Sequence, residues 1–434
     1  MANQLDNNEN ISHQITNKDR FYLIYYIVLL GGLLLLIHPN TSYSILIRFA
    51  YLGMLVIPLF FNPRFTPFVI TCFYGTCKNA CYSLLPESFE FCIAIVLVLF
   101  FLNLKKLNFR YGEIKFLLIF FVYSFFISLF NYDLQQNFLS VGLVAILLYP
   151  FIKDEEDVKL LAVGFCLMSF VLAIMYFQNF SYYSFSVGKE DEFERGTWQN
   201  MNVLAGAIGC GLPLSLALLL NVIKGYKPKT LRIFLVANVV LLLFTLATLS
   251  SRGALIAAAT SSVLLIIFSK IKTRYKLLII IGMAFLALFM VFNGFFDLFI
   301  YRMTEESSAE TGGGRTIIWQ NKLNPFFQDT FSTQIFGMGR EKCVNYGVYY
   351  STHNDFITAI VGFGFVGLLL MVLFVLSPMF KARKQNFVPI GALTLFLVLE
   401  CMVLEPLYRG HLPYWMFYVL LMKLVTVQKQ SQPS

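Results

Sequence analysis

Apolar residues run in long stretches along the chain, with short polar connections between them. A transmembrane helix needs about 20 predominantly apolar residues to cross roughly 30 Å of hydrocarbon. Fourteen stretches reach or approach this length: 21–37, 43–61, 65–83, 87–104, 116–130, 137–152, 158–180, 201–223, 231–249, 253–269, 276–300, 356–380, 386–404 and 411–427. The pattern predicts an all-α, polytopic membrane protein with about 14 transmembrane helices. The number is 12 if the two weakest stretches, 65–83 and 137–152, do not span.

Polar segments divide the chain into five parts. We expect a cytoplasmic tail at 1–20, a transmembrane domain at 21–300 with an outer loop at 181–200, a large outer loop at 301–355, further transmembrane helices at 356–427 and a second cytoplasmic tail at 428–434. No internal repeat stands out, so one membrane domain is the simplest organisation.

The loop at 301–355 is much longer than the inner connections. Long loops usually carry function or are disordered. Apolar residues recur in this one with helical spacing, at Ile317, Ile318 and Trp319 and again at Phe326, Phe327 and Phe331. This pattern predicts helices that form an ordered extracytoplasmic cap.

Composition and charge agree with a membrane protein. The chain is 58% hydrophobic and 13% charged, against roughly 45–50% and 25% in soluble domains, and this difference excludes a water-soluble fold. With the N-terminus in the cytoplasm, 21 of the 33 Lys and Arg residues flank inner segments, nine lie in outer loops and three lie within spans. An excess of Lys and Arg is expected in the cytoplasmic loops of a membrane protein. The distribution of basic residues therefore predicts an orientation with both termini in the cytoplasm. It also explains the net charge of +9, which does not indicate nucleic-acid binding.

Small residues in the apolar stretches indicate packing. Seven of the eight cysteines lie in or beside these stretches. No histidine or cysteine pair completes a zinc pattern, so we expect no metal site. Gly362, Gly364 and Gly367 permit close approach of a neighbouring helix.

Arginine is concentrated in the outer segments, where it supplies six of nine basic residues, against six of 21 in the inner segments. A guanidinium keeps its charge near a low-dielectric surface and forms two parallel hydrogen bonds with phosphate oxygens. The bias indicates a bound phosphate or pyrophosphate. The alternative is that these arginines pair with acids of the same loops. Arg252 fits that alternative least, because it sits between two apolar stretches with no adjacent acid.

Four local patterns follow one another on the outer face. They are ERGTWQNMNVLAG at 194–206, SSRGAL at 250–255, GGGRTIIWQ at 312–320 with FGMGRE at 336–341, and THNDFITAIVGFGFVGLLL at 352–370. In this order and placement they resemble the signature of the O-antigen ligase and O-antigen polymerase superfamily. The resemblance covers roughly residues 195–370.

The resemblance implies a multi-span, GT-C-like glycosyltransferase that acts on the outer, periplasmic face of the cytoplasmic (inner) membrane. Such an enzyme moves a glycan from undecaprenyl pyrophosphate to an acceptor hydroxyl in lipopolysaccharide or capsule synthesis, without a metal, a nucleotide sugar or another cofactor. Its partners would be the lipid-linked glycan, membrane lipid and a chain-length regulator. Arg252 and Arg315 match the family's pyrophosphate-contacting arginines, and His353 matches its essential histidine.

The chemistry of these residue types supports the same roles. A diphosphate leaving group needs preorganised cations, and an acceptor hydroxyl needs a base that titrates near neutrality. His353 is the best candidate for this base among the four histidines, with a pKa lowered by nearby arginines. The alternative is that His353 starts a helix and is satisfied by local hydrogen bonds.

Five more charged residues are candidates for the same site. Arg195 of ERGTWQ and Arg340 of FGMGRE are further candidates for contacting the pyrophosphate. Arg302, Glu405 and Arg409 also lie in outer segments, the last two as a charged pair in EPLYRGH.

Two enzymes fit the resemblance. A polymerase extends a lipid-linked repeat unit, and a ligase joins finished polymer to lipid A core. Ten residues separate Arg195 from Gly206, and ten separate Arg302 from Gly313. This spacing resembles an arginine and glycine pattern of polymerase outer loops. We favour the polymerase and keep the ligase as the alternative.

A reading from another class is a lipid-linked oligosaccharide flippase or other secondary transporter. Transporters usually show repeated halves and charged residues deep within the spans. Here the halves do not match, and the charges collect on one face. A transporter would be favoured if Arg252, Arg315 and His353 were scattered in space.

The predicted orientation can be tested by labelling single cysteine substitutions from outside the cell. Cysteines at positions 189, 310 and 342 should react, because these positions lie in the predicted outer loops, whereas cysteines at 107, 227 and 272 should not. The reverse pattern of labelling would overturn the orientation.

Overall fold

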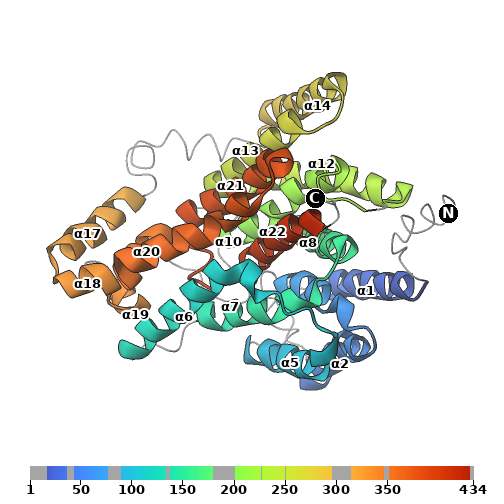
Figure 1. The fold of residues 1–434 in the computed structure, drawn as a ribbon. Helices are drawn as coiled ribbons and strands as arrows, with labels where there is room; N and C mark the ends of the chain where they lie inside the picture. The colour runs from blue at the N-terminus through green and yellow to red at the C-terminus, as the bar shows by residue number, and fades with distance from the viewer. Residues whose placement is uncertain are drawn as a thin grey trace, which may run out of the picture.

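The computed structural model describes residues 17–36, 44–76, 89–132, 137–178, 201–225, 227–249, 251–295, 314–346 and 351–430, and within these ranges it is helical and contains no strand (Figure 1). Its α-helices are α1 (Asn17–Leu36), α2 (Ile45–Phe61), α3 (Thr66–Val69), α5 (Phe89–Leu102), α6 (Lys115–Phe130), α7 (Asn137–Leu148), α8 (Glu155–Gln178), α10 (Met201–Gly209), α11 (Gly211–Leu219), α12 (Lys229–Thr248), α13 (Arg252–Phe268), α14 (Thr273–Phe292), α17 (Arg315–Gln328), α18 (Phe331–Phe336), α19 (Arg340–Asn345), α20 (Asp355–Lys381), α21 (Phe387–Val403) and α22 (Leu412–Gln430). The predicted fold class, all-α, is confirmed over the described residues.

Several helices are suited to a membrane. Six described helices are long and apolar enough to cross one: Tyr111–Phe130, Glu155–Gln178, Asn202–Leu219, Lys229–Thr248, Thr273–Phe292 and Asp355–Lys381. Six shorter apolar helices fall within other predicted spans. The long helices expose large apolar side chains, such as Ile233 on α12 and Phe285 on α14. Such exposure is expected where lipid replaces water. The count of 12 to 14 spans stays a prediction.

Helix α22 forms the centre of the bundle. Its side chains from Tyr414 to Met422 are completely buried. It packs against α7, α8, α20 and α21, and its Tyr418 ring lies 4.4 Å from the Phe374 ring of α20, centroid to centroid. In contrast, α14 buries only Met290. The last helices of the chain therefore make the core, with α8 beside them.

The two ends of the bundle are distinct. The cap helices α17, α18 and α19 gather at the left of Figure 1, where α20 begins. The 27 residues of α20 extend about 40 Å from there. At its far end, the Lys381 ammonium donates to the Glu113 carbonyl, and the Lys423 ammonium lies 3.8 Å from the Glu113 carboxylate. Basic residues thus meet at the end opposite the cap.

A seam of glycines joins the cap to α20. The Gly339 amide donates to the Gly362 carbonyl at 2.8 Å. Gly364 interrupts the regular helix of α20 with φ +71°. A Cβ at this position would overlap the carbonyl of Ile335 near the end of α18. The Tyr123 hydroxyl donates to the Phe363 carbonyl at 2.8 Å, beside this kink. Close packing was the predicted role of the α20 glycines, and it is confirmed at Gly362 and Gly364, where the cap is the packing partner. Gly367 instead faces Tyr123 of α6.

Buried Lys322 holds the cap helices together. Its ammonium, with no exposed surface, donates to the carbonyls of Cys343 (2.7 Å), Val344 (3.0 Å) and Tyr346 (3.2 Å). Carbonyls at the end of a helix such as α19 lack partners within the helix, and a cation there is favourable. The helices predicted in the loop are confirmed over residues 314–346.

Candidate active site

The THND motif forms the turn that leads into α20. The Asn354 side-chain oxygen accepts hydrogen bonds from the amides of Phe356 (2.9 Å) and Ile357 (3.2 Å), which caps the helix. His353, one residue earlier, has φ +49°, in the left-handed region that few non-glycine residues adopt. Backbone strain of this kind clusters at functional sites, where the surrounding structure holds it.

Asp355 ties this turn to the connection between α21 and α22. Its carboxylate oxygens accept hydrogen bonds from the amides of Leu407 and Tyr408, each at 3.0 Å. Asp355 is completely buried, and a buried carboxylate is tolerated only when it has such partners. The start of α20 and the 404–411 connection are therefore held together by hydrogen bonds to one side chain.

A second buried carboxylate, Glu405, connects the same two segments. It is 1% exposed and has φ +61°. Its carboxylate accepts hydrogen bonds from the Thr358 hydroxyl (2.6 Å) and the Ser351 hydroxyl, and the Arg409 guanidinium lies 3.5 Å away. Charged hydrogen bonds of this kind are stronger than neutral ones, so Glu405 is fixed beside the THND turn.

Helix α17 brings the cap to this turn. Arg315 is its first residue, and the Trp319 indole N–H donates to the Thr352 carbonyl at 2.7 Å. Residues four apart lie on the same face of a helix. The Trp319 hydrogen bond thus holds the face that carries Arg315 beside Thr352 and His353.

Arg252 enters from a third direction, as the first residue of α13. Helix α13 packs along α21, and a Cβ on Gly253 would collide with the side chain of Val403 near the end of α21. This close approach sets the start of α13 beside the connection that carries Glu405.

The charges of these residues influence one another. Burial lowers the pKa of Arg315, and the positive charge of Arg252 lowers it further. Two guanidinium groups in one partly buried place repel each other unless an anion lies between them. The pair is suited to a ligand with negative charge.

His353 is neutral near pH 7. Its pKa is lowered to about 4, first by burial, then by the charges of Arg409 and Arg315, with Glu405 opposing the shift. The predicted lowering by arginines is confirmed in direction, and burial, which the sequence did not indicate, is the largest cause. The expected titration near neutrality is wrong, because the pKa of His353 lies well below 7. A neutral imidazole can accept a proton, and this one lies near the guanidinium groups of Arg409 and Arg315.

Part of the chain that carries this site matches a known protein family. Residues 237–372 match the O-antigen ligase family. The predicted resemblance to the O-antigen ligase and polymerase superfamily is confirmed by this match. No curated protein matches the chain.

The segment that matches the O-antigen ligase family begins within α12 and ends within α20. It contains Arg252, Arg315, Trp319 and His353. Glu405 and Arg409 lie beyond it, although the structure sets them against the same turn.

The remaining predicted site residues have different placements. Arg340 lies on α19 with its Cα against Gly362, about two turns along α20 from His353. Its Nε is buried without a hydrogen-bond partner among the described residues. Arg195 and Arg302 lie outside the described residues.

Three residues that position the site were not predicted for that role: Trp319, Ser351 and Thr358. The sequence pattern assigns Trp319 only to an apolar helix. Its place one helical turn after Arg315, in a polar loop, was the available signal. Ser351 and Thr358 gain their role through Glu405, some 50 residues away in the chain, and no local pattern reports such a contact.

Replacing Trp319 with Phe tests whether α17 positions Arg315. The ring is kept and the hydrogen bond to Thr352 is lost, so glycan transfer by the purified protein should fall by up to about tenfold. Ile317→Ala is the matched control, because Ile317 is 49% exposed on the same helix. Equal kcat and KM in wild type and Trp319→Phe would show that the contact does not position the site.

Proposed function

We propose that the protein is a glycosyltransferase that moves a glycan from undecaprenyl pyrophosphate to an acceptor hydroxyl. The observation that carries this proposal is the grouping of two mutually repelling arginines, Arg252 and Arg315, with a neutral histidine, His353. The pair offers a place for a diphosphate, and the imidazole offers a base. A match to the O-antigen ligase family over the same residues supports glycan transfer in polysaccharide assembly.

The proposed reaction is a displacement at the anomeric carbon. The acceptor oxygen forms a bond to this carbon and loses its proton to His353. The bond from the carbon to the phosphate oxygen breaks, and its electron pair leaves with undecaprenyl pyrophosphate. Arg252 and Arg315 stabilise the charge that develops on the diphosphate, which is the task a divalent cation performs in many phosphate-transfer enzymes.

The other charged residues receive supporting roles. Glu405 and Arg409 position the THND turn, and Arg409 adds positive charge near His353. Arg340 lies farther along α20, where it would contact a more distant part of the donor. We extend the same proposal to Arg195 and Arg302, because they lie in the same predicted outer loops.

We place the reaction on the outer face of the cytoplasmic membrane, with both termini inside. The distribution of basic residues in the sequence supports this orientation. Lys381 and Lys423 gather at the end opposite the candidate site, as expected if that end faces the cytoplasm. A chain-length regulator is the proposed protein partner.

Polymerase is our first choice because of the arginine and glycine spacing in the outer loops. The ligase is the second candidate, and the match to the O-antigen ligase family is compatible with both enzymes. The purified protein can be given lipid-linked repeat units alone or together with lipid A core. Elongation without the core would identify a polymerase, and transfer only in its presence would identify a ligase.

The grouping of Arg252, Arg315 and His353 argues against the transporter.

Arg315→Lys should be nearly as damaging as Arg315→Ala, with transfer reduced roughly 10- to 100-fold. A lysine keeps the charge but cannot form the two parallel hydrogen bonds with diphosphate, and charged hydrogen bonds have energies that correspond to this loss. Polymer length in cells and transfer by purified protein would measure the effect. Arg340→Lys is the control and should be milder. Full polymer length with Arg315→Lys would reduce the role of Arg315 to bulk positive charge.

His353→Ala should lower transfer by about 10²–10⁴-fold while donor binding is kept, because a lost base affects the chemical step. In the wild type, kcat/KM should fall only as the pH drops through about 4, the pKa of His353 in the free protein. The anionic donor favours the imidazolium and raises this pKa, so kcat should fall at a higher pH than kcat/KM.

Both variants and wild type must be compared at equal protein level. Near wild-type turnover in His353→Ala would remove His353 from the reaction. Loss of donor binding together with turnover would make His353 a donor-site residue instead of the base.

A further inference from the structure

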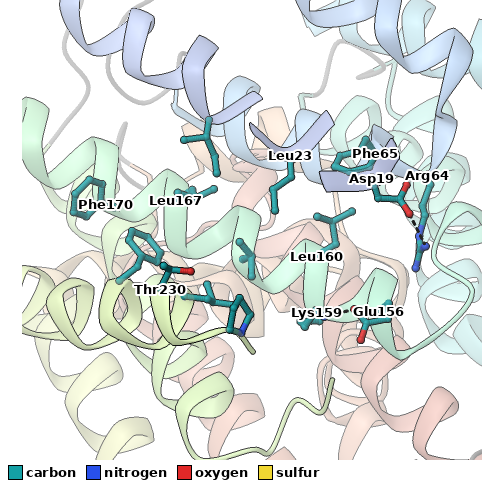
Figure 2. A pocket seen from close by; sticks show the side chains of 15 residues that line it. Asp19, Leu23, Arg64, Phe65, Glu156, Lys159, Leu160, Leu167, Phe170 and Thr230 are labelled. Atoms are coloured by element: carbon teal, nitrogen blue, oxygen red, sulfur yellow. Dashed lines mark hydrogen bonds and ion pairs between the residues drawn. The ribbon is translucent and has the colours of Figure 1, made fainter. Parts of the chain in front are cut away.

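A pocket of about 450 Å³ lies between α1, α8 and α12, away from the candidate active site. Figure 2 shows Leu23 of α1 and Leu160, Leu167 and Phe170 of α8 around the same space. Small-molecule pockets usually measure roughly 300–1,000 Å³. An α-helix with its side chains is about 10–12 Å across, so this space suits a narrow chain better than a partner helix.

The pocket adjoins a surface that is suited to lipid. Ile27 lines the pocket and is itself 44% exposed. Next to it, Ile24 on α1 is 62% exposed, and Ile233 on α12 is 60% exposed. Apolar side chains this exposed on helices of a membrane protein are expected to contact hydrocarbon. A lipid chain could therefore enter the pocket without crossing water.

At one rim of the pocket, the charged side chains form ion pairs with one another. The Arg64 guanidinium donates to Asp157 and, at 3.0 Å, to Asp154, and it lies 3.8 Å from Asp19. Figure 2 shows Asp19 and Arg64 at this edge. These acids exceed their single basic partner, so this rim does not attract an anion.

The opposite rim, at the start of α12, is basic. Pro228, Thr230 and Leu231 line the pocket, and their chain neighbours Lys229 and Arg232 are exposed. Just before them, the pKa of Lys227 is lowered to about 8 by burial and by the positive charges of Lys159 and Arg232, with Glu156 opposing. Positive charge thus dominates this rim.

We infer that the pocket binds one hydrocarbon chain of an anionic phospholipid, whose phosphate lies against Lys229 and Arg232. The chain would contact Leu160, Leu167 and Phe170 and the headgroup would remain at the membrane surface, where lysine and arginine side chains reach phosphate. Because α8 begins beside the end of α22, this rim lies at the end opposite His353. The lipid is therefore distinct from the proposed glycan donor.

Native mass spectrometry of the purified full-length protein tests this inference. The protein is given phosphatidylglycerol or phosphatidylcholine with identical acyl chains, and retained lipid is counted. We expect one phosphatidylglycerol to be retained in preference to phosphatidylcholine. The double variant Lys229→Gln and Arg232→Gln should weaken this retention about fivefold per charge removed. Lys270→Gln with Lys272→Gln is the matched control, because both lysines are exposed between α13 and α14.

A second variant tests the pocket itself. Leu231→Trp places a bulky ring in the space and should reduce retention of phosphatidylglycerol while helical content by circular dichroism is unchanged. Equal retention of the two lipids, or no effect of the Lys229 and Arg232 changes, would overturn the inference. Stronger lipid retention after deletion of residues 2–16 would also overturn it, since the chain's own tail would then be the occupant.

Discussion

The carboxylate of Asp355 joins the first turn of α20 to the connection before α22 through two backbone amides, and the candidate site depends on this contact. In a completely buried position the carboxylate loses its hydration, and the amides of Leu407 and Tyr408 replace it. His353 lies two residues before Asp355, and Arg409 follows Tyr408 directly. Fixing the two segments at this point therefore also fixes the imidazole and the guanidinium near each other.

The close contact of glycines between the cap and α20 brings Arg315 to the site. The cap can reach the turn only because its backbone lies directly on the backbone of α20 at Gly339 and Gly362. Gly364 adopts a left-handed conformation where the cap crosses the helix, and any side chain there would push the cap away. The Trp319 hydrogen bond then places the start of α17 beside Thr352. Arg315 therefore reaches His353 through backbone packing that a single added methyl group would disturb.

The bundle separates two kinds of chemistry. At the cap end, the positive charges of Arg252 and Arg409 lower the pKa values of Arg315 and His353, respectively, and a cluster of positive charge favours an anionic ligand. At the other end, Arg64, Lys381 and Lys423 have acidic or carbonyl partners, and the apolar pocket adjoins the surface suited to lipid. The proposed transfer and the proposed lipid site rest on different ends, so either one can fail without the other.

The sequence by itself determined the class of protein, because hydrocarbon requires long apolar helices and composition reports this directly. It also proposed Arg252, Arg315 and His353 as site residues, because their motifs resemble those of the O-antigen ligase and polymerase superfamily. Only the tertiary structure decided that Glu405 and Trp319 position these residues and that burial holds His353 neutral. Those properties come from contacts between residues far apart in the chain and from exclusion of water, and neither has a local pattern in the sequence.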